Sequence, residues 1–248
     1  MTAPALHIAG NLRLGAETLC PALALDCPAG GWACLLGPSG AGKSTLARLL
    51  AGLPGPARLE GTIRASDGLP LAGRVALMAQ TDQLLPWADV LGNVTLGARL
   101  RGERPDRARA RALLARVGLS GFDSRRPATL SGGQRQRVAL ARTLMEDKPV
   151  VVLDEPFSAL DAANRAMMQD LAADVLRGRS VILITHDPLE AARLADRGWL
   201  MGPDGAAALD LPATATPRAL DAPETLAAQA ALYRRLCAPL DRSPCPAA

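Results

Sequence analysis

The sequence predicts an α/β fold with a mixed, mainly parallel core sheet, a small antiparallel β subdomain and an inserted helical subdomain. The first observation is three short apolar runs at 32–36, 150–153 and 181–184. Strands that are apolar on both faces are typical of a parallel sheet covered by helices on both sides. The second observation is a glycine-rich stretch directly after the first run. The third is that acidic residues or a histidine directly follow the other two runs.

The glycine-rich stretch predicts a site for the phosphates of a nucleotide. It matches G-x-x-x-x-G-K-[ST], in which the glycines let several backbone N–H groups point at one anion. The helix that begins near Lys43 adds its unpaired N-terminal amides and its dipole. Lys43 is one of only two lysines in an arginine-rich chain, and a compact ammonium suits the outer phosphates. The predicted nucleotide-binding residues of this loop are Gly37, Pro38, Ser39, Gly40, Ala41, Gly42, Lys43, Ser44 and Thr45.

Composition narrows the class of protein. The chain has 248 residues, enough for one α/β domain with an extension, and a net charge of only +4. With three Trp, one Tyr and two Phe it has few rings to stack on nucleic acid, so we expect no nucleic-acid partner. No apolar run reaches the length of about 18 residues that spans a bilayer, and no secretory leader is evident. Five cysteines without C-x-x-C spacing predict buried thiols rather than a zinc site.

The N-terminal half contains further strand signals. Residues 5–30 alternate weakly between apolar and polar side chains and predict short antiparallel strands. Residues 53–74 are rich in Gly and Pro, so we expect a turn-dominated connection with one strand near Ile63. A buried strand over 75–79 then ends at Gln80.

The remainder of the chain is mostly helical in character. Residues 88–147 predict the helical subdomain, with Pro105 opening one helix and Gly118 closing it. We therefore expect a nucleotide-binding domain over 1–201 and a C-terminal extension over 202–248 that ends in a frayed tail. The extension contains one expected amphipathic helix over 224–236, whose apolar face is formed by Leu226, Ala230, Tyr233 and Leu236.

Two adjacent carboxylates and a histidine follow the central strands. Carboxylates at the tip of an apolar strand are costly unless they face a metal ion or a reacting water. Asp154 is placed to hold Mg²⁺ beside Ser44, and Glu155 is free to orient or deprotonate an attacking water. His186 is placed to donate to a γ-phosphate at the same sheet edge, the alternative being a histidine satisfied within the core.

A second helix start also carries glycines. Ser131 is a good N-cap, and Gly132 and Gly133 expose the amides of the helix that follows, as at an anion site. The alternative is an ordinary capped helix that packs inward through Val138. A helix N-terminus here has no phosphate to bind within its own chain, because the 37–45 loop already has that role. The glycine-rich helix start at Ser131 is explained if a partner presents the phosphate.

In their order these motifs resemble those of the nucleotide-binding subunits of ATP-binding cassette (ABC) transporters, over roughly residues 5–200. The glycine-rich loop matches the family's phosphate loop, Gln80 its glutamine loop, 130–134 its signature and 150–155 its acidic strand. Residues 158–161 are similar to its D-loop, and 185–187 to its switch-histidine motif. The resemblance implies a P-loop NTPase fold, ATP and Mg²⁺ as cofactors, and ATP hydrolysis coupled to transport.

The resemblance also implies a site shared between two copies of the chain. In a head-to-tail homodimer, two ATP molecules lie between the subunits, each between Lys43 of one copy and the signature of the other. The signature residues concerned are Ser131, Gly132, Gly133 and Gln134, and Asp161 lines the dimer seam, serves as a helix N-cap, or does both. Gln80 joins Ser44 and Asp154 at the metal, and the catalytic residues are Glu155, His186 and Gln80.

Two features depart from the family pattern. The family usually places an aromatic ring against adenine, whereas residues 11–20 offer only Arg13 and Leu14. Nucleotide affinity and base discrimination are therefore expected to be weaker. The connection over 53–74 is also short for the family, which predicts a trimmed antiparallel sheet.

The loop after Gln80 indicates a partner. Its Leu-Leu-Pro-Trp run at 84–87 either packs beneath the helical subdomain or forms a groove for a membrane permease docking near Gln80–Trp87, as the resemblance implies. This run resembles ATPase subunits of importers for nitrate, sulfonates, taurine and thiamine pyrimidine precursors, with 220–223 favouring the last group. Such importers imply a periplasmic solute-binding protein and a peripheral position on the cytoplasmic face of the inner membrane. The alternatives are a soluble ABC ATPase, which usually carries coiled-coil insertions or a second cassette, and a P-loop kinase, which has no use for the signature.

Overall fold

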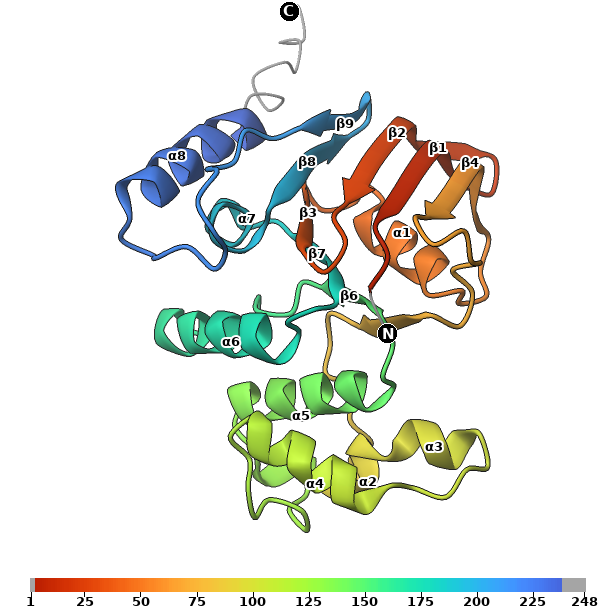
Figure 1. Cartoon of the computed structure of the whole chain (residues 1–248), viewed down its shortest axis with the longest axis vertical. Helices are drawn as coiled ribbons and strands as arrows, with labels where there is room; N and C mark the ends of the chain where they lie inside the picture. Colours follow the sequence, from red (N-terminus) through yellow and green to blue (C-terminus); the bar gives the residue numbers. More distant parts are fainter. Residues whose placement is uncertain (1–2, 238–248) are drawn as a thin grey trace, which may run out of the picture.

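The centre of the molecule is a six-stranded sheet in the order β5-β6-β7-β3-β8-β9 (Figure 1). It is seen in a computed structural model that describes residues 3–237. Neighbouring strands pair in parallel, except that β8 and β9 are antiparallel. The mixed, mainly parallel sheet is therefore confirmed, whereas β8 and β9 were not predicted. The strands are β3 (Trp32–Leu36), β5 (Val75–Met78), β6 (Val150–Asp154), β7 (Ser180–Thr185), β8 (Arg197–Gly202) and β9 (Gly205–Ala208).

Every residue of β3, β6 and β7 is buried, because two separate cores form on the two faces of the sheet. In β6 the side chains of Val151 and Leu153 enter the core covered by helices. Those of Val150 and Val152 enter the core shared with the antiparallel sheet and the first helix. The continuous apolar runs thus reflect alternation between two buried faces.

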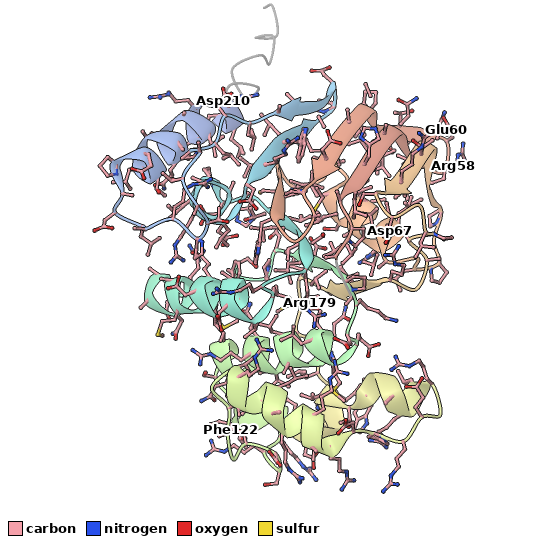
Figure 2. All side chains as sticks on the ribbon, in the orientation of Figure 1. Arg58, Glu60, Asp67, Phe122, Arg179 and Asp210 are labelled. Carbon is pink, nitrogen blue, oxygen red and sulfur yellow. The ribbon has the colours of Figure 1, made fainter. Side chains whose placement is uncertain are left out.

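The small antiparallel sheet has the order β2-β1-β4, formed by β1 (Leu6–Leu14), β2 (Glu17–Cys27) and β4 (Ala57–Ala65). The strand expected near Ile63 is confirmed as β4, but the connection is less turn-dominated than expected, because β4 pairs along the whole of β1. Gly61 accounts for the difference: a Cβ there would lie 2.0 Å from the carbonyl oxygen of Ala9, so this glycine permits close strand approach rather than a turn. The alternating Arg58 and Glu60 point to solvent on the outer face (Figure 2).

The helices divide between the sheet and a separate helical subdomain. Helices α2 to α5 lie together below the sheets in Figure 1, which confirms an inserted helical region, and α5 also packs against β5. Helices α6, α7 and α8 cover the sheet face opposite α1. The helices are α1 (Lys43–Leu50), α2 (Val90–Val94), α3 (Leu96–Leu100), α4 (Arg107–Arg116), α5 (Gly132–Met145), α6 (Ala162–Val175), α7 (Pro188–Leu194) and α8 (Pro223–Cys237). Over residues 3–237, no helix combines the length and apolar character needed to cross a bilayer.

The expected C-terminal helix is present as α8, but only Leu236 of its predicted apolar face packs against the core, and the other three residues are exposed. Leu226 and Tyr233 are 48% and 62% exposed, whereas Leu232 is buried. Ala228 and Leu236 pack against the helix-side core beside it. In this alanine-rich segment several faces have similar hydrophobicity, so the spacing alone did not identify the buried one. The expected frayed tail lies outside the described residues.

A buried arginine attaches the C-terminal extension to the domain. Arg218 is 4% exposed, and its guanidinium donates to the carbonyls of Ala192 at 2.6 Å, Ala195 at 2.9 Å and Thr214 at 3.0 Å. Two of these carbonyls lie at the end of α7 and the third lies in the extension. The extension is therefore fixed to the sheet domain before α8 begins.

We expect Arg218→Met to destabilise the protein by about 3 kcal/mol, because it leaves several buried carbonyls without a donor. The measurement is the free energy of unfolding from urea titration, with the exposed Arg234→Met on α8 as the matched control. Equal unfolding free energies for the two variants would contradict this role.

Candidate functional site

The predicted site residues converge at one edge of the sheet, because parallel strands present their carboxyl ends together. Gly37 follows β3, Gln80 follows β5, Asp154 ends β6 with Glu155 after it, and His186 follows β7. At this edge a pocket of about 280 Å³ opens between the glycine-rich loop and the strand ends. Its lining residues are Leu14, Leu19, Ser39, Gly40, Gly42, Lys43, Ser44, Thr45, Gln80 and Glu155.

The glycine-rich loop adopts a conformation that its glycines permit. Gly42 has φ +90°, in the left-handed region. A Cβ on Gly37 would lie 2.5 Å from the carbonyl oxygen of Met201 in β8, so a side chain there would push the loop away from the sheet. Gly42 is the N-cap of α1 and provides no side-chain cap. The first amides of α1 therefore lie at the loop without a side-chain acceptor.

Lys43 is held within the loop that it is predicted to serve. It is 5% exposed, and its Nζ donates to the carbonyls of Gly37 and Pro38, both at 2.8 Å. Burial lowers the pKa of Lys43, while the nearby carboxylates of Glu155 and Asp154 oppose this shift. The ammonium is thus desolvated and positioned beside the pocket. It is suited to an anionic ligand that restores the lost solvation.

Ser44 lines the pocket and is hydrogen-bonded to the buried Asp154 at the end of β6. The Ser44 hydroxyl donates to Oδ1 of Asp154 at 3.0 Å, and Asp154 is 6% exposed. Burial raises the pKa of Asp154, and the Ser44 hydrogen bond partly offsets this. A hydroxyl and a desolvated carboxylate are a donor set that fits a hard cation such as Mg²⁺.

Glu155 lies at the meeting point of the strand ends. Its backbone has φ +47°, an uncommon conformation for a non-glycine residue, and its N–H donates to the carbonyl of Ile184 at 2.9 Å. The side chain lies 3.2 Å from Nε2 of Gln80 and 3.1 Å from Nδ1 of His186. The structure therefore brings together three predicted catalytic side chains from three strand ends. A carboxylate oriented in this way is able to accept a proton from water.

The signature turn lies away from this pocket. Ser131 and Gln134 form a capping box, in which the Ser131 hydroxyl accepts from the Gln134 amide and Gln134 Oε1 accepts from the Ser131 amide. The residues lining the pocket, within the described chain, do not include this turn. Gly133 lies instead near Leu160, next to the D-loop, where Asp161 is the N-cap of α6. The structure thus does not place Ser131, Gly132, Gly133, Gln134 or Asp161 in the pocket of their own chain.

Two features near the site were missed by sequence reasoning. Leu19 lines the pocket beside Leu14, on the strands where an aromatic ring was sought. Glu190, on α7 behind His186, is 2% exposed and hydrogen-bonded to Thr185, and burial raises its pKa to about 7. The signal for Glu190 was available, because a carboxylate within an apolar helix segment at the sheet edge indicates a buried group.

The position of Lys43 predicts that Lys43→Ala weakens ATP binding by about 10- to 100-fold, through loss of charge-assisted hydrogen bonds to phosphate. Calorimetric titration measures the dissociation constant. Lys148→Ala removes the only other lysine, outside the pocket, and is the matched control. Unchanged affinity in Lys43→Ala would show that the loop does not bind phosphate through this side chain.

Glu190 predicts a pH-dependent stability. Its pKa of about 7 lies above the ordinary value of 4.5, so the folded state holds the proton more tightly than the unfolded state. The contribution of Glu190 to the free energy of unfolding is therefore fully present below about pH 4.5 and is lost as pH rises through about 7. Glu190→Gln retains a neutral side chain, so we expect its unfolding free energy to exceed that of the wild type by up to about 3 kcal/mol at pH 8, and by little at low pH. Urea titrations at pH 5 and pH 8, with exposed Glu224→Gln as control, measure this; the same difference at both pH values would contradict it.

Comparison with known proteins agrees with this geometry. The family model described as "ABC transporter" matches residues 21–158. An uncharacterized ABC transporter ATP-binding protein from Haemophilus influenzae is 43% identical over 193 residues, covering 77% of this chain and 79% of that protein. A taurine import ATP-binding protein from Pseudomonas fluorescens is 50% identical, and the match covers 68% of this chain and 66% of that protein. An aliphatic sulfonates import ATP-binding protein from Delftia acidovorans is 43% identical, and the match covers 94% of this chain and 95% of that protein. The chain therefore belongs to the ABC transporter family, as one of its ATP-binding proteins.

Proposed function

We propose that this chain is the ATP-hydrolysing subunit of an ABC importer, and that two copies close head to tail around two ATP molecules. The observation that carries the proposal is the separation of two anion sites within one chain. The Lys43 pocket lacks the Ser131 turn among its lining residues, although this helix start presents amides suited to phosphate. An ATP that engages both must lie between two copies.

The residues around the pocket have distinct proposed roles. The 37–45 loop cradles the phosphates, Glu155 is the general base for the attacking water, and Gln80 and His186 orient that water and the γ-phosphate. Ser44, Asp154 and Gln80 would hold Mg²⁺. When bound, this ion supplies positive charge that offsets the charge of the phosphates.

The docking loop, which we define as residues 82–87, is the proposed contact with a membrane permease. Leu84 is 9% exposed and packs into the helix-side core, whereas Trp87 is 72% exposed. Leu84 thus fits the interpretation that this run packs beneath the helical subdomain, and Trp87 fits the interpretation that it contacts a partner. An exposed tryptophan at the edge of a glutamine loop suits an apolar segment of a partner. The same importer would include a periplasmic solute-binding protein, and this subunit would lie on the cytoplasmic face of the membrane.

For the transported solute we propose a small organic sulfonate, such as taurine. Support comes from relatives named for taurine and aliphatic sulfonate import, one of which covers nearly the whole chain. The thiamine pyrimidine precursor favoured by the resemblance at 220–223 has no support among these relatives. The solute would be recognised by other subunits, so no residue of this chain is assigned to it.

Glu155→Gln tests the shared site. We expect this variant to bind ATP with Mg²⁺ but to turn over at least about 100-fold more slowly, and so to elute as a dimer on size exclusion with ATP. Wild-type protein co-expressed with the permease of a taurine or sulfonate importer should co-purify with that membrane subunit. A variant that hydrolyses ATP at the wild-type rate, or stays monomeric with ATP, would contradict the proposal.

A further inference from the structure

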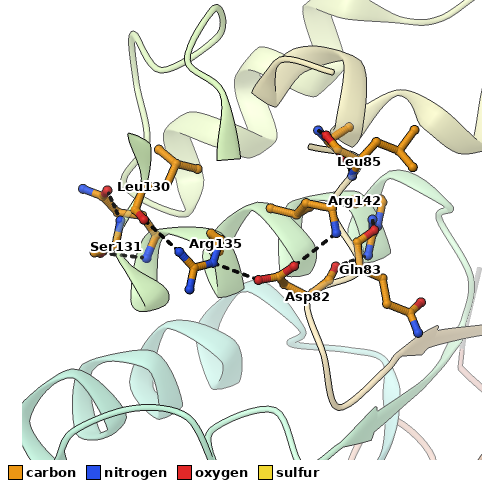
Figure 3. A network of polar contacts seen from close by, with 10 residues as sticks. Asp82, Gln83, Leu85, Leu130, Ser131, Arg135 and Arg142 are labelled. Atoms are coloured by element: carbon orange, nitrogen blue, oxygen red, sulfur yellow. Dashed lines mark hydrogen bonds and ion pairs between the residues drawn. The ribbon is translucent and has the colours of Figure 1, made fainter. Parts of the chain in front are cut away.

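A polar network joins the docking loop to the helix that begins at the signature turn (Figure 3). Asp82 Oδ2 accepts a hydrogen bond from Arg135 Nε at 3.0 Å, and its Oδ1 accepts from the backbone N–H of Leu84 at 3.1 Å. Nη1 of Arg135 donates to the carbonyl of Leu130 at 2.9 Å. Leu130 directly precedes Ser131. One arginine thus contacts both the loop and the backbone entering the signature turn.

The rest of the docking loop is also fixed to the helical subdomain. Arg142 of α5 donates to the carbonyl of Asp82 at 2.6 Å and to that of Gln83 at 2.8 Å. Asn93 of α2 is fully buried, and its side chain accepts from the amide of Leu85 at 2.7 Å and donates to its carbonyl at 3.2 Å. The loop backbone is therefore held to α2 and α5 together. A displacement of the loop must be accommodated by these helices.

At its other end the loop continues from the catalytic pocket. Gln80, two residues before Asp82, donates to Glu155 at 3.2 Å. The path from Glu155 through Gln80, Asp82 and Arg135 to the turn at Ser131 lies within one chain. In the proposed dimer, however, the Ser131 turn serves the ATP held by the other copy. This path therefore connects the two nucleotide sites and runs through the docking loop, which also contains the exposed Trp87.

We propose that the Asp82–Arg135 ion pair transmits displacement of the docking loop to the Ser131 turn. The displacement that the ion pair transmits sets how the turn engages the ATP of the partner copy. This inference rests on the proposed function. Asp82 and Arg135 are positioning residues, because neither lines the phosphate pocket. Their side chains are 29% and 39% exposed, so the pair adds little to stability. Its loss is expected to affect communication rather than folding.

Hydrogen exchange of the isolated full chain tests the connection without a permease. In Glu155→Gln, ATP with Mg²⁺ should slow amide exchange both at 131–134 and in the docking loop, because coupling between two sites is reciprocal. In Glu155→Gln with Arg135→Gln, the slowing at 131–134 should persist, whereas that in the docking loop should fall by about fivefold or more. Unchanged slowing in the docking loop would overturn the proposal.

The reconstituted transporter provides the second readout. We expect Arg135→Gln to keep the permease-free ATPase rate within about twofold of wild type but to reduce stimulation by the loaded transporter by about fivefold. Asp82→Asn retains an acceptor for Leu84 but removes the charge, and the double variant should be no worse than either single variant. The matched control is Arg111→Gln, which breaks an exposed ion pair with Asp123, 2.5 Å apart, and leaves Asp82 and Arg135 unchanged.

The outcomes separate this inference from the proposed function. If wild-type protein shows linked exchange but no permease stimulates it, the ion pair transmits between sites and the importer assignment fails. If the permease stimulates wild type, Arg135→Gln and the Arg111 control equally, the importer assignment stands and the proposed role of the ion pair is overturned. Additive losses in the double variant would also overturn it, because the two residues would then act independently.

Discussion

The structure depends on the desolvation of opposite charges at one edge of a buried sheet. Lys43 and Asp154 are 5% and 6% exposed, and burial disfavours the charged form of each. They tolerate this position because the loop carbonyls surround the ammonium and the Ser44 hydroxyl donates to the carboxylate. Such an arrangement is costly for folding alone. It is suited to a ligand that carries both negative phosphates and a cation.

The remaining architecture holds this edge in place. β3, β6 and β7 are fully buried between two cores, so the residues at their carboxyl ends are fixed by packing on both sides. Gly37 is pressed against β8, which sets the height of the loop over the sheet. The uncommon backbone of Glu155 then directs its side chain toward Gln80 and His186. Rigid strands thus position side chains that are far apart in the sequence.

The sequence predicted the parts of the fold and site whose signals are local. The apolar runs of β3, β6 and β7, the loop before α1 and the N-cap at Ser131 are each encoded within a few residues. A strand near Ile63 was predicted, but the full length of β4 was not, because Gly61 resembles a turn residue and its role is visible only once the carbonyl of Ala9 lies beside it. The buried face of α8 could not be identified from its alanine-rich spacing, because it depends on which surface the extension meets. The Asp82–Arg135 pair joins residues 53 positions apart, so no local pattern reported it.

The central claim is that each ATP site is completed by a second copy of the chain, and mixed dimers test it most directly. Lys43→Ala removes the phosphate lysine, and Ser131→Arg blocks the signature turn, so neither variant alone should retain ATP in a Glu155→Gln background. When the two variants are mixed, one site of each mixed dimer combines the intact Lys43 of one copy with the intact Ser131 of the other. The account predicts that mixing restores about one retained ATP per mixed dimer, measured after gel filtration. No retained ATP on mixing, or full retention by Ser131→Arg alone, would show that one copy encloses its nucleotide without the other.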